Sequence, residues 1–248
     1  MEVTAIKTKI FKEREDLNAF VYAHIPILKD GSVLAVASKI VALSEGRTIL
    51  LRSKKEKEAL IKRESEWAQR ILPEWWLTVR DGTVVVNAGL DDSNVHPVRG
   101  KTSNGAGGKT ILLPKDSFKS AEKLRAELCA HYKIKKLGIV ITDSRIMPLR
   151  AGVMGIALGY AGFRGIRDYR GTPDLFGRKL KVTQTDIADS LATAATVVMG
   201  EGAERQPLAI LEEVPVEFVQ KVKQSELKIS RERDMYRFLF KTGTRKKK

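Results

Sequence analysis

Two short segments of this chain place oxygen-bearing side chains at the point where a predicted strand ends. Residues 87–95 (NAGLDDSNV) follow the run TVVV, and residues 141–145 (ITDSR) continue the run LGIV. Each strand would deliver aspartate to an exposed loop, Asp91 and Asp92 in the first segment and Asp143 in the second. Carboxylate, hydroxyl and amide oxygens suit Mg²⁺ or Mn²⁺, which commonly bridge to phosphates. The pattern predicts a hard-cation site, although Asp, Ser and Asn are also ordinary turn residues.

A hydroxyl and an ammonium stand side by side at Ser38 and Lys39, near the end of the apolar run 32–41. We interpret that run as a strand, and such a pair at a strand end can hold a phosphate. The alternative is an edge position whose lysine lies in solvent. Residues 201–207 (EGAERQP) follow a predicted helix and carry two carboxylates and several free backbone N–H groups. They could serve a cation and a phosphate, or simply form the loop that ends the helix.

A glycine-rich segment, residues 96–109 (HPVRGKTSNGAGGK), contains basic residues that could close over phosphates. Its GAGGK run is not a P-loop, because the spacing of that motif is missing and no predicted strand immediately precedes it. The segment is therefore predicted to be a loop that either closes over phosphates by another arrangement or is simply mobile.

The elements around these segments follow from turn residues and hydrophobic periodicity. Asp81 and Gly82 are a strong signal for a type I′ hairpin that leads into TVVV. Residues 54–71 are expected to form a charged helix with one apolar side, and residues 185–199 a small-residue helix suited to close packing. Residues 216–240 are expected to form a partly helical extension that docks on the body.

Composition restricts the class of protein. The chain has 248 residues, of which 43% are hydrophobic, so it can build a core in one large domain or two small ones. No apolar run approaches the roughly 18 residues of a membrane span, and the N-terminus is charged too soon for a secretory signal. We therefore expect a cytoplasmic globular protein with no membrane partner.

The formal net charge of +15 calls for a polyanion, an anionic small molecule or solubility as its explanation. The basic residues are scattered along the chain and lack the aromatic interleaving of a platform that stacks single-stranded bases. Composition alone does not choose among these explanations, and a nucleic-acid partner is not favoured.

Eight segments resemble, in order and in spacing, one family of proteins, the coenzyme F420-0:L-glutamate ligases, also called F420-0:gamma-glutamyl ligases. The likeness runs from about residue 31 to residue 211, and the eight segments in register argue against coincidence. The segments are SKIVALSEGR, NAGLDDSNV, LLPKD, GIVITDS, PLRAG, IALGYAG, DYRGTPDLFGRKL and ADSLATAATVVMGEGAERQPL.

The resemblance implies an α+β fold with two lobes built on antiparallel β-sheets and flanking helices. We expect this ligase-like domain over residues 1–215, followed by a helical extension and basic tail over residues 216–248. The family forms an intertwined homodimer. Its activity is GTP- and divalent-cation-dependent: it joins L-glutamate to a carboxylate-bearing acceptor, a phospholactyl deazaflavin, through an acyl phosphate.

The resemblance also carries residue roles onto matching positions of this chain. Asp91 and Asp143 are expected to be metal ligands that serve catalysis. Ser144 is similar to the hydroxyl ligand of a second metal, where the family commonly has Thr, and Glu201 would lie near that metal. Two sites for Mg²⁺ or Mn²⁺ are thus implied. The expected nucleotide contacts are Ser38, Lys39, Asn94, Gly200, Glu201, Gly202, Ala203, Glu204, Arg205, Gln206 and Pro207.

Several positions depart from the family pattern. The family's N-terminal Gly-(Leu/Ile)-Pro segment is replaced by KTKIF, and Leu43 stands where Lys is common. Ile146 and Met147 replace a Gly-Arg pair, Val153 replaces Gln, and Glu201 also replaces Gln. The metal ligands are kept, whereas contacts to the nucleotide and the acceptor are altered.

Two other functions remain open from the sequence. The altered N-terminal segment and Leu43 would suit a nucleotide- and metal-binding paralogue without ligase activity. The net charge alone would suit a basic nucleic-acid-binding protein, which should bind in a steeply salt-dependent manner.

Overall fold

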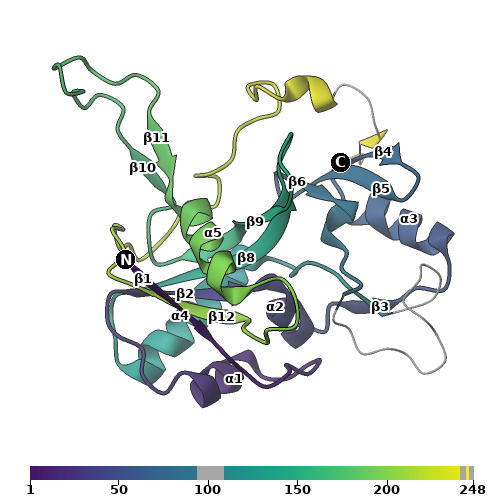
Figure 1. Ribbon diagram of the computed structural model, residues 1–248, viewed down its shortest axis with the longest axis horizontal. Coiled ribbons are helices and arrows are strands. Elements are labelled where there is room, and N and C mark those ends of the chain that lie inside the picture. Colours follow the sequence, from purple (N-terminus) through teal and green to yellow (C-terminus); the bar gives the residue numbers. More distant parts are fainter. Residues whose placement is uncertain (94–108, 241–243, 246–248) are drawn as a thin grey trace.

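Five strands from distant parts of the chain form the central sheet of the computed structural model, which describes residues 1–93, 109–240 and 244–245 (Figure 1). The pair β2–β8 is parallel, whereas the other neighbours are antiparallel. In spatial order the strands are β1 (Glu2–Ile6), β12 (Leu208–Glu212), β2 (Ser32–Ala37), β8 (Leu137–Ile146) and β9 (Val153–Ala161).

Helices cover both faces of this sheet. Successive side chains of a strand point to opposite faces, so Leu34 and Val36 of β2 pack with α1 and α4, while Val33 and Ala35 pack with α5. Burial on both faces explains why β2 and β8 are almost continuously apolar. The helices of this part are α1 (Leu17–His24), α2 (Ser38–Ser44), α4 (Ser117–Tyr132) and α5 (Ile187–Met199).

The small residues of α5 let this helix approach the sheet closely, as its sequence predicts. Ala188, Ala192 and Ala195 are fully buried. A Cβ atom at Gly155 of β9 would lie 2.6 Å from the carbonyl oxygen of Ala192, so only glycine fits there. The C-terminal end of α5 is thereby held beside strands β8 and β9.

A second lobe is built on a smaller antiparallel sheet, in the order β13-β4-β5-β6 (Figure 1). Asp81 and Gly82 both have positive φ angles between β5 and β6, which confirms the predicted hairpin turn. The elements of this lobe are α3 (Lys54–Arg63), β4 (Trp67–Leu72), β5 (Trp75–Arg80), β6 (Thr83–Val86), η1 (Asn87–Gly89) and β13 (Thr244–Arg245), with β3 (Thr48–Leu50) paired to β7 (Lys109–Ile111).

An arm of the chain, residues 166–186, projects from the body (Figure 1). In the sequence it lies between β9 and α5. Its base is the antiparallel pair β10 (Ile166–Asp168) and β11 (Gln184–Asp186). The side chains of Leu175 and Phe176, beyond this pair, are 98% and 84% exposed. The arm therefore presents apolar side chains away from the core of the chain.

The segment after β12 connects the two lobes. Phe218 packs with the core of the central sheet, while Phe240, in the short helix η2 (Arg237–Phe240), packs with Trp67 of the second lobe. Between them, the Tyr160 hydroxyl donates a 2.7 Å hydrogen bond to Glu226. Burial and this carboxylate raise the pKa of Tyr160 far above its ordinary value. The phenol therefore stays protonated and able to donate.

The predicted α+β class built on antiparallel sheets is confirmed, but several element boundaries differ. The run 32–41 is a strand only to Ala37, where its pairing with β8 ends, and Ser38 begins helix α2. The predicted helix 54–71 ends at Arg63, and residues 67–72 form β4, because Trp67 and Ala68 are buried by strand pairing. In both segments, pairing with a strand from elsewhere in the chain determined where the strand begins or ends.

Residues 216–240 are less helical than the sequence predicts. They contain turns and the short helix η2 and are held by individual contacts on two lobes. Among the described residues, no helix combines the length and the apolarity needed to span a bilayer.

The N-cap of α5 generates a prediction about stability. Asp186 caps the helix by accepting a 3.0 Å hydrogen bond from the Asp189 N–H, and burial raises the pKa of Asp186 to about 6. A carboxyl with a raised pKa favours folding at low pH, and this contribution is lost as the pH rises from about 4 to about 6. Asp186→Asn keeps the cap and removes the charge.

We therefore expect Asp186→Asn to raise the free energy of unfolding at pH 8 by about 1 kcal/mol, a value reduced by solvent screening. The gain should shrink toward pH 4, as measured by urea unfolding across that range. Asp16→Asn is the matched control, because exposed Asp16 caps α1 in the same way through the Ala19 N–H. An equal response of both variants would contradict the buried-charge explanation.

Candidate active site

A cavity of about 2070 Å³ lies between the two lobes. Strands β8 and β9, the start of α2 and the loop after α5 line it from the first lobe, and β5, β6 and the loop after η1 line it from the second. Residues 227–240 of the C-terminal segment supply a further wall. The cavity is large enough to hold more than one small substrate.

Two neighbouring residues at the start of α2 bring the predicted aspartates together. The Ser38 hydroxyl donates a 2.8 Å hydrogen bond to Asp143 Oδ1, and Lys39 Nζ lies 2.7 Å from Asp91 Oδ2. Lys39 also donates to the carbonyl and hydroxyl oxygens of Ser93 at 3.1 Å. Two aspartates that are 52 positions apart in the sequence thus each contact one of two adjacent residues.

The backbone explains why Asp91 and Ser38 are so placed. Asn87, Ala88 and Gly89 of η1 have positive φ angles and turn the chain sharply after β6. Asp91 then forms paired backbone hydrogen bonds with Ile111, of 3.0 and 2.8 Å. On the other side, the parallel pairing of β2 with β8 ends next to Asp143, so the helix that follows β2 begins beside it.

Asp91 is held in its ionised form. Burial raises its pKa, but the Lys39 ammonium and hydrogen bonds from Lys39 and Ser93 outweigh burial, so the pKa of Asp91 lies below its ordinary value. Its side chain remains 39% exposed. Asp91 is therefore an anionic oxygen donor that faces the cavity at neutral pH.

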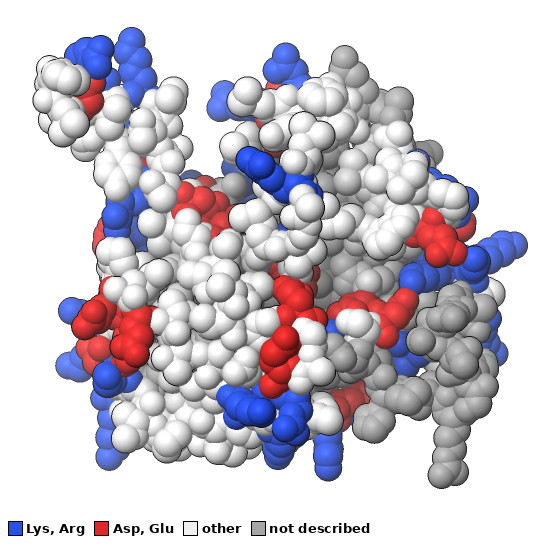
Figure 2. Space-filling view, in the orientation of Figure 1, with Lys and Arg blue, Asp and Glu red and all other residues white. Residues whose placement is uncertain are grey.

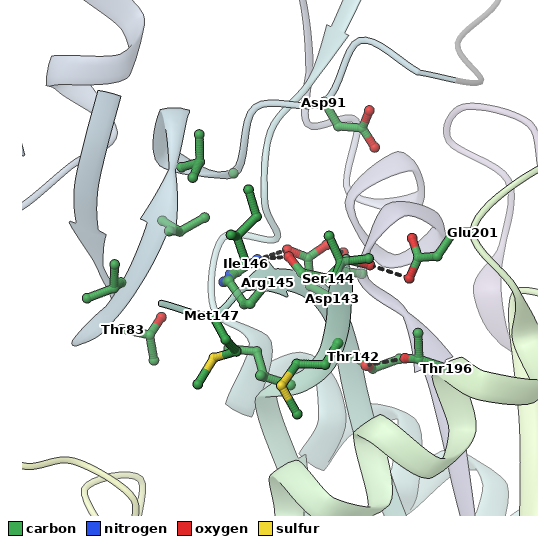
Figure 3. Close-up of a pocket in the computed structure, with 18 of the residues that line it drawn as sticks. Thr83, Asp91, Thr142, Asp143, Ser144, Arg145, Ile146, Met147, Thr196 and Glu201 are labelled. Carbon is green, nitrogen blue, oxygen red and sulfur yellow. Dashed lines mark hydrogen bonds and ion pairs between the residues drawn. The ribbon is translucent and has the colours of Figure 1, made fainter. Parts of the chain in front are cut away.

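Ser144 and Glu201 form a second oxygen pair at the same end of the cavity. The Ser144 hydroxyl donates a 2.6 Å hydrogen bond to Glu201 Oε1. Glu201 comes from the loop after α5, which begins at Gly200 with a φ of 76°. Figure 3 shows Asp91, Asp143, Ser144 and Glu201 around this end of the cavity.

The cavity collects the predicted site residues from four separate segments. Asn94 lies outside the described residues, so its prediction stays open. Asp92 does not line the cavity: its carboxylate binds Lys57 and the Thr110 hydroxyl, each at 2.5 Å. The predicted residues that line the cavity are Ser38, Lys39, Asp91, Asp143, Ser144, Gly200, Glu201, Gly202, Ala203, Glu204, Arg205, Gln206 and Pro207.

A family model described as F420-0:Gamma-glutamyl ligase matches residues 5–213 of the chain. The chain belongs to this family. Named relatives agree: the coenzyme F420:L-glutamate ligase of Methanopyrus kandleri is 36% identical over 74% of the chain and 75% of the relative. Those of Methanococcus maripaludis and Methanocaldococcus jannaschii are 36% and 35% identical, each over 88% of the chain and 90% of the relative.

The oxygen donors of this ligase-family site suit Mg²⁺ or Mn²⁺. Carboxylates and hydroxyls are hard ligands, and both ions accept water and phosphate oxygens to complete their coordination. Within the described part of the chain, no group of three or more His, Cys, Asp and Glu side chains could hold an ion by itself. The residues present therefore fit an ion shared with phosphate better than an ion enclosed by protein.

Sequence reasoning missed Arg145, the side chain that binds Asp143 most directly. Arg145 Nη1 donates to Asp143 Oδ2 and, at 2.9 Å, to the Ser144 carbonyl oxygen. The alternation of side chains along β8 could have placed Arg145 on the same face as Asp143. The wall contributed by residues 227–240, which mixes apolar and charged side chains, was also missed, because those residues contain no catalytic side-chain pattern.

The positions that depart from the family pattern are not scattered. All of them line the cavity, as do residues 8–11 of the KTKIF segment that replaces the family's N-terminal segment. The departures are Leu43, Ile146, Met147, Val153 and Glu201.

One face of the molecule shows how its surface charges are distributed. On the face shown in Figure 2, Lys and Arg side chains lie among Asp and Glu and do not form one continuous basic surface. A nucleic-acid-binding face usually gathers its basic residues in a patch or stripe. The net charge of +15 therefore gives no separate functional site on this face.

Proposed function

We propose that the protein is a GTP- and divalent-metal-dependent ligase that joins L-glutamate to the carboxylate of an acceptor, coenzyme F420-0 or a related compound. One observation carries the proposal beyond family membership. Ser38 and Lys39 bind Asp143 and Asp91 at one end of a single cavity, next to the loop of residues 200–207. Hydroxyl, ammonium and carboxylate groups bind phosphates and divalent metals, and their presence at one end of the cavity supports the proposal.

The chemistry explains the need for a nucleotide. A carboxylate is a poor electrophile until its oxygen attacks the γ-phosphorus of GTP, which forms an acyl phosphate and releases GDP. The amine of glutamate then attacks the acyl carbon, and inorganic phosphate leaves as the amide forms. Divalent ions supply charge neutralisation on the transferring phosphoryl group when bound.

Different residues of the chain would bind the ions, the phosphates and the nucleotide. Asp91 and Asp143 would hold one ion, and Ser144 with Glu201 a second. The Lys39 side chain is 27% exposed and flexible, so its ammonium can move from Asp91 to a phosphate oxygen when ligands bind. Backbone N–H groups of the loop after α5 would contact the nucleotide.

The apolar part of the cavity supports an acceptor with a ring system. Trp75, Val84, Met147, Met154 and Tyr236 line the cavity and are between 38% and 53% exposed. Large apolar side chains that remain this accessible inside a concave site usually contact a ligand. The deazaflavin ring of the acceptor would lie against them, with its carboxylate toward the aspartates.

The second candidate is a nucleotide-binding paralogue without ligase activity. It is favoured by the contacts of Asp91 and Asp143 with Lys39 and Arg145, because a cation already accompanies each carboxylate. Tight GTP binding without turnover, across glutamate and a range of acceptors, would establish it.

We also propose a homodimer, supported by the arm of residues 166–186. Its apolar side chains Leu175, Phe176 and Val182 are at least 84% exposed on one chain. A projecting arm of this kind can be covered by a second copy, as in domain-swapped assemblies.

The ligase proposal predicts different effects for adjacent aspartates. Asp143→Asn and Asp91→Asn should lower the rate of amide and GDP formation about a hundredfold or more, the scale of losing an active-site charge. Asp92→Asn should keep near-wild-type rates, because Asp92 binds Lys57 away from the cavity. Coupled detection of GDP and the glutamylated product measures both. Full activity of the Asp143 and Asp91 variants would refute the assignment.

The proposed contact of the acceptor ring with the accessible apolar side chains of the cavity predicts a selective effect of Tyr236→Ser. Loss of a large apolar contact should raise the KM for the acceptor about tenfold while leaving the KM for glutamate unchanged. Phe238→Ser is the matched control, since Phe238 is 58% exposed and does not line the cavity. If both variants alter the acceptor KM equally, the apolar side chains of the cavity do not contact the acceptor.

The dimer proposal predicts that Phe176→Asp converts the protein to a monomer. A charge at the centre of an apolar contact should weaken association about a hundredfold, as measured by sedimentation velocity over a range of concentrations. Ile27→Asp, at a position that is 76% exposed after α1, should leave the assembly unchanged. A wild-type protein that sediments as a monomer at high concentration would contradict the proposal.

A further inference from the structure

Arg145 is a buried cation that is only partly satisfied. Its side chain is 5% exposed, and Nη1 makes the contacts to Asp143 and Ser144. Its Nε and Nη2 atoms are buried without a hydrogen-bond partner, the only such side-chain atoms among the described residues. A buried guanidinium depends strongly on the charge that compensates it. Here the Asp143 carboxylate is in direct contact with the guanidinium, and the Asp189 carboxylate is close enough to interact with its charge.

The two cations that accompany the aspartates differ in mobility. Lys39 is 27% exposed, and its flexible stem can carry the ammonium away from Asp91. Arg145 belongs to strand β8, where it pairs with Met154 of β9, and its side chain is only 5% exposed at the wall of the cavity. Burial on a paired strand therefore holds Arg145 beside Asp143 more firmly than Lys39 is held beside Asp91.

Both oxygens of Asp143 already accept hydrogen bonds. Oδ2 binds Arg145, and Oδ1 binds the Ser38 hydroxyl at 2.8 Å. The hydroxyl can rotate and offer its own lone pairs to an ion, whereas a guanidinium has none to offer. A divalent ion at Asp143 would therefore approach Oδ1 while the positive charge of Arg145 remained close by.

We propose that Arg145 is a fixed counter-ion for Asp143, a positioning residue that makes divalent-cation binding at this carboxylate depend on the phosphates of the nucleotide. The inference rests on the proposed function. The guanidinium neutralises the Asp143 carboxylate and repels the divalent cation, so the nucleotide-free protein binds this cation weakly. A triphosphate brings the missing negative charge, and each ligand then strengthens binding of the other by the same factor.

This arrangement would prevent the ion from occupying the site before the nucleotide. An ion bound early would meet an acceptor carboxylate without a phosphoryl donor. Loading as an ion–nucleotide complex places the two together from the start.

The test is a Mn²⁺ titration of the full chain, in which electron paramagnetic resonance detects the free ion. It is carried out with and without a non-hydrolysable GTP analogue, and Mn²⁺ held by free nucleotide is subtracted. For the wild-type protein we expect the nucleotide to lower the Kd for Mn²⁺ at least about tenfold. Tight binding that is equal in both conditions would overturn the inference without any variant.

Substitutions then assign the effect to the charge. Arg145→Met should tighten nucleotide-free Mn²⁺ binding about tenfold or more and weaken the coupling to nucleotide, whereas Arg145→Lys should resemble the wild type. The matched control is Arg80→Met, because Arg80 is also buried and binds Glu64 at 2.8 Å but does not line the cavity. A role that is only structural would alter stability and leave the Mn²⁺ affinity of Arg145→Met within twofold of wild type, which would refute the proposal.

The outcomes separate this inference from the proposed function. If the wild type binds Mn²⁺ with nucleotide and forms product, but Arg145→Met is unchanged in affinity, only the inference fails. If the wild type binds no Mn²⁺ in either condition, the metal site is absent and both proposals fall.

Discussion

The structure depends on the parallel pairing of β2 with β8. Ala37 is aligned with Thr142 where this pairing ends. The residues that follow them in the chain, Ser38 and Asp143, therefore lie side by side. Ser38 binds one aspartate, and the adjacent Lys39 reaches the other. A slip of one residue in this register would turn Asp143 to the opposite face and separate the pair. The apolar layers on both faces of the sheet hold the register in place.

The cavity joins two environments that suit different parts of one reaction. At one end, charged and hydroxyl groups stand close together and are backed by the buried guanidinium of Arg145. Along the sides, accessible apolar side chains from both lobes form a surface on which a flat ring could rest. The proposed reaction, which moves a phosphoryl group onto the carboxylate of a large acceptor, would use both environments within one site.

Local patterns predicted the parts of the site that local structure determines. The hairpin at Asp81 and Gly82 followed from turn chemistry. Asp143 was expected in a loop after its strand, but it lies inside β8, which continues to Ile146. The pairing partner of each strand is set by contacts across the whole chain, so the end of β2 at Ala37 was not predictable. The same applies to Arg145, whose importance appears only when its burial beside Asp143 is known. The family resemblance supplied residue roles, but not the cations that accompany the aspartates.

The strand order of the central sheet has a consequence for biosynthesis. β12, near residue 210, is inserted between β1 and β2, which lie within the first 37 residues. During translation, β1 has no partner in this sheet until most of the polypeptide has emerged from the ribosome. Contacts between residues so distant in sequence make folding slow, and the unpaired edges stay exposed meanwhile. The nascent chain is therefore most vulnerable to aggregation until its last strand in this sheet arrives.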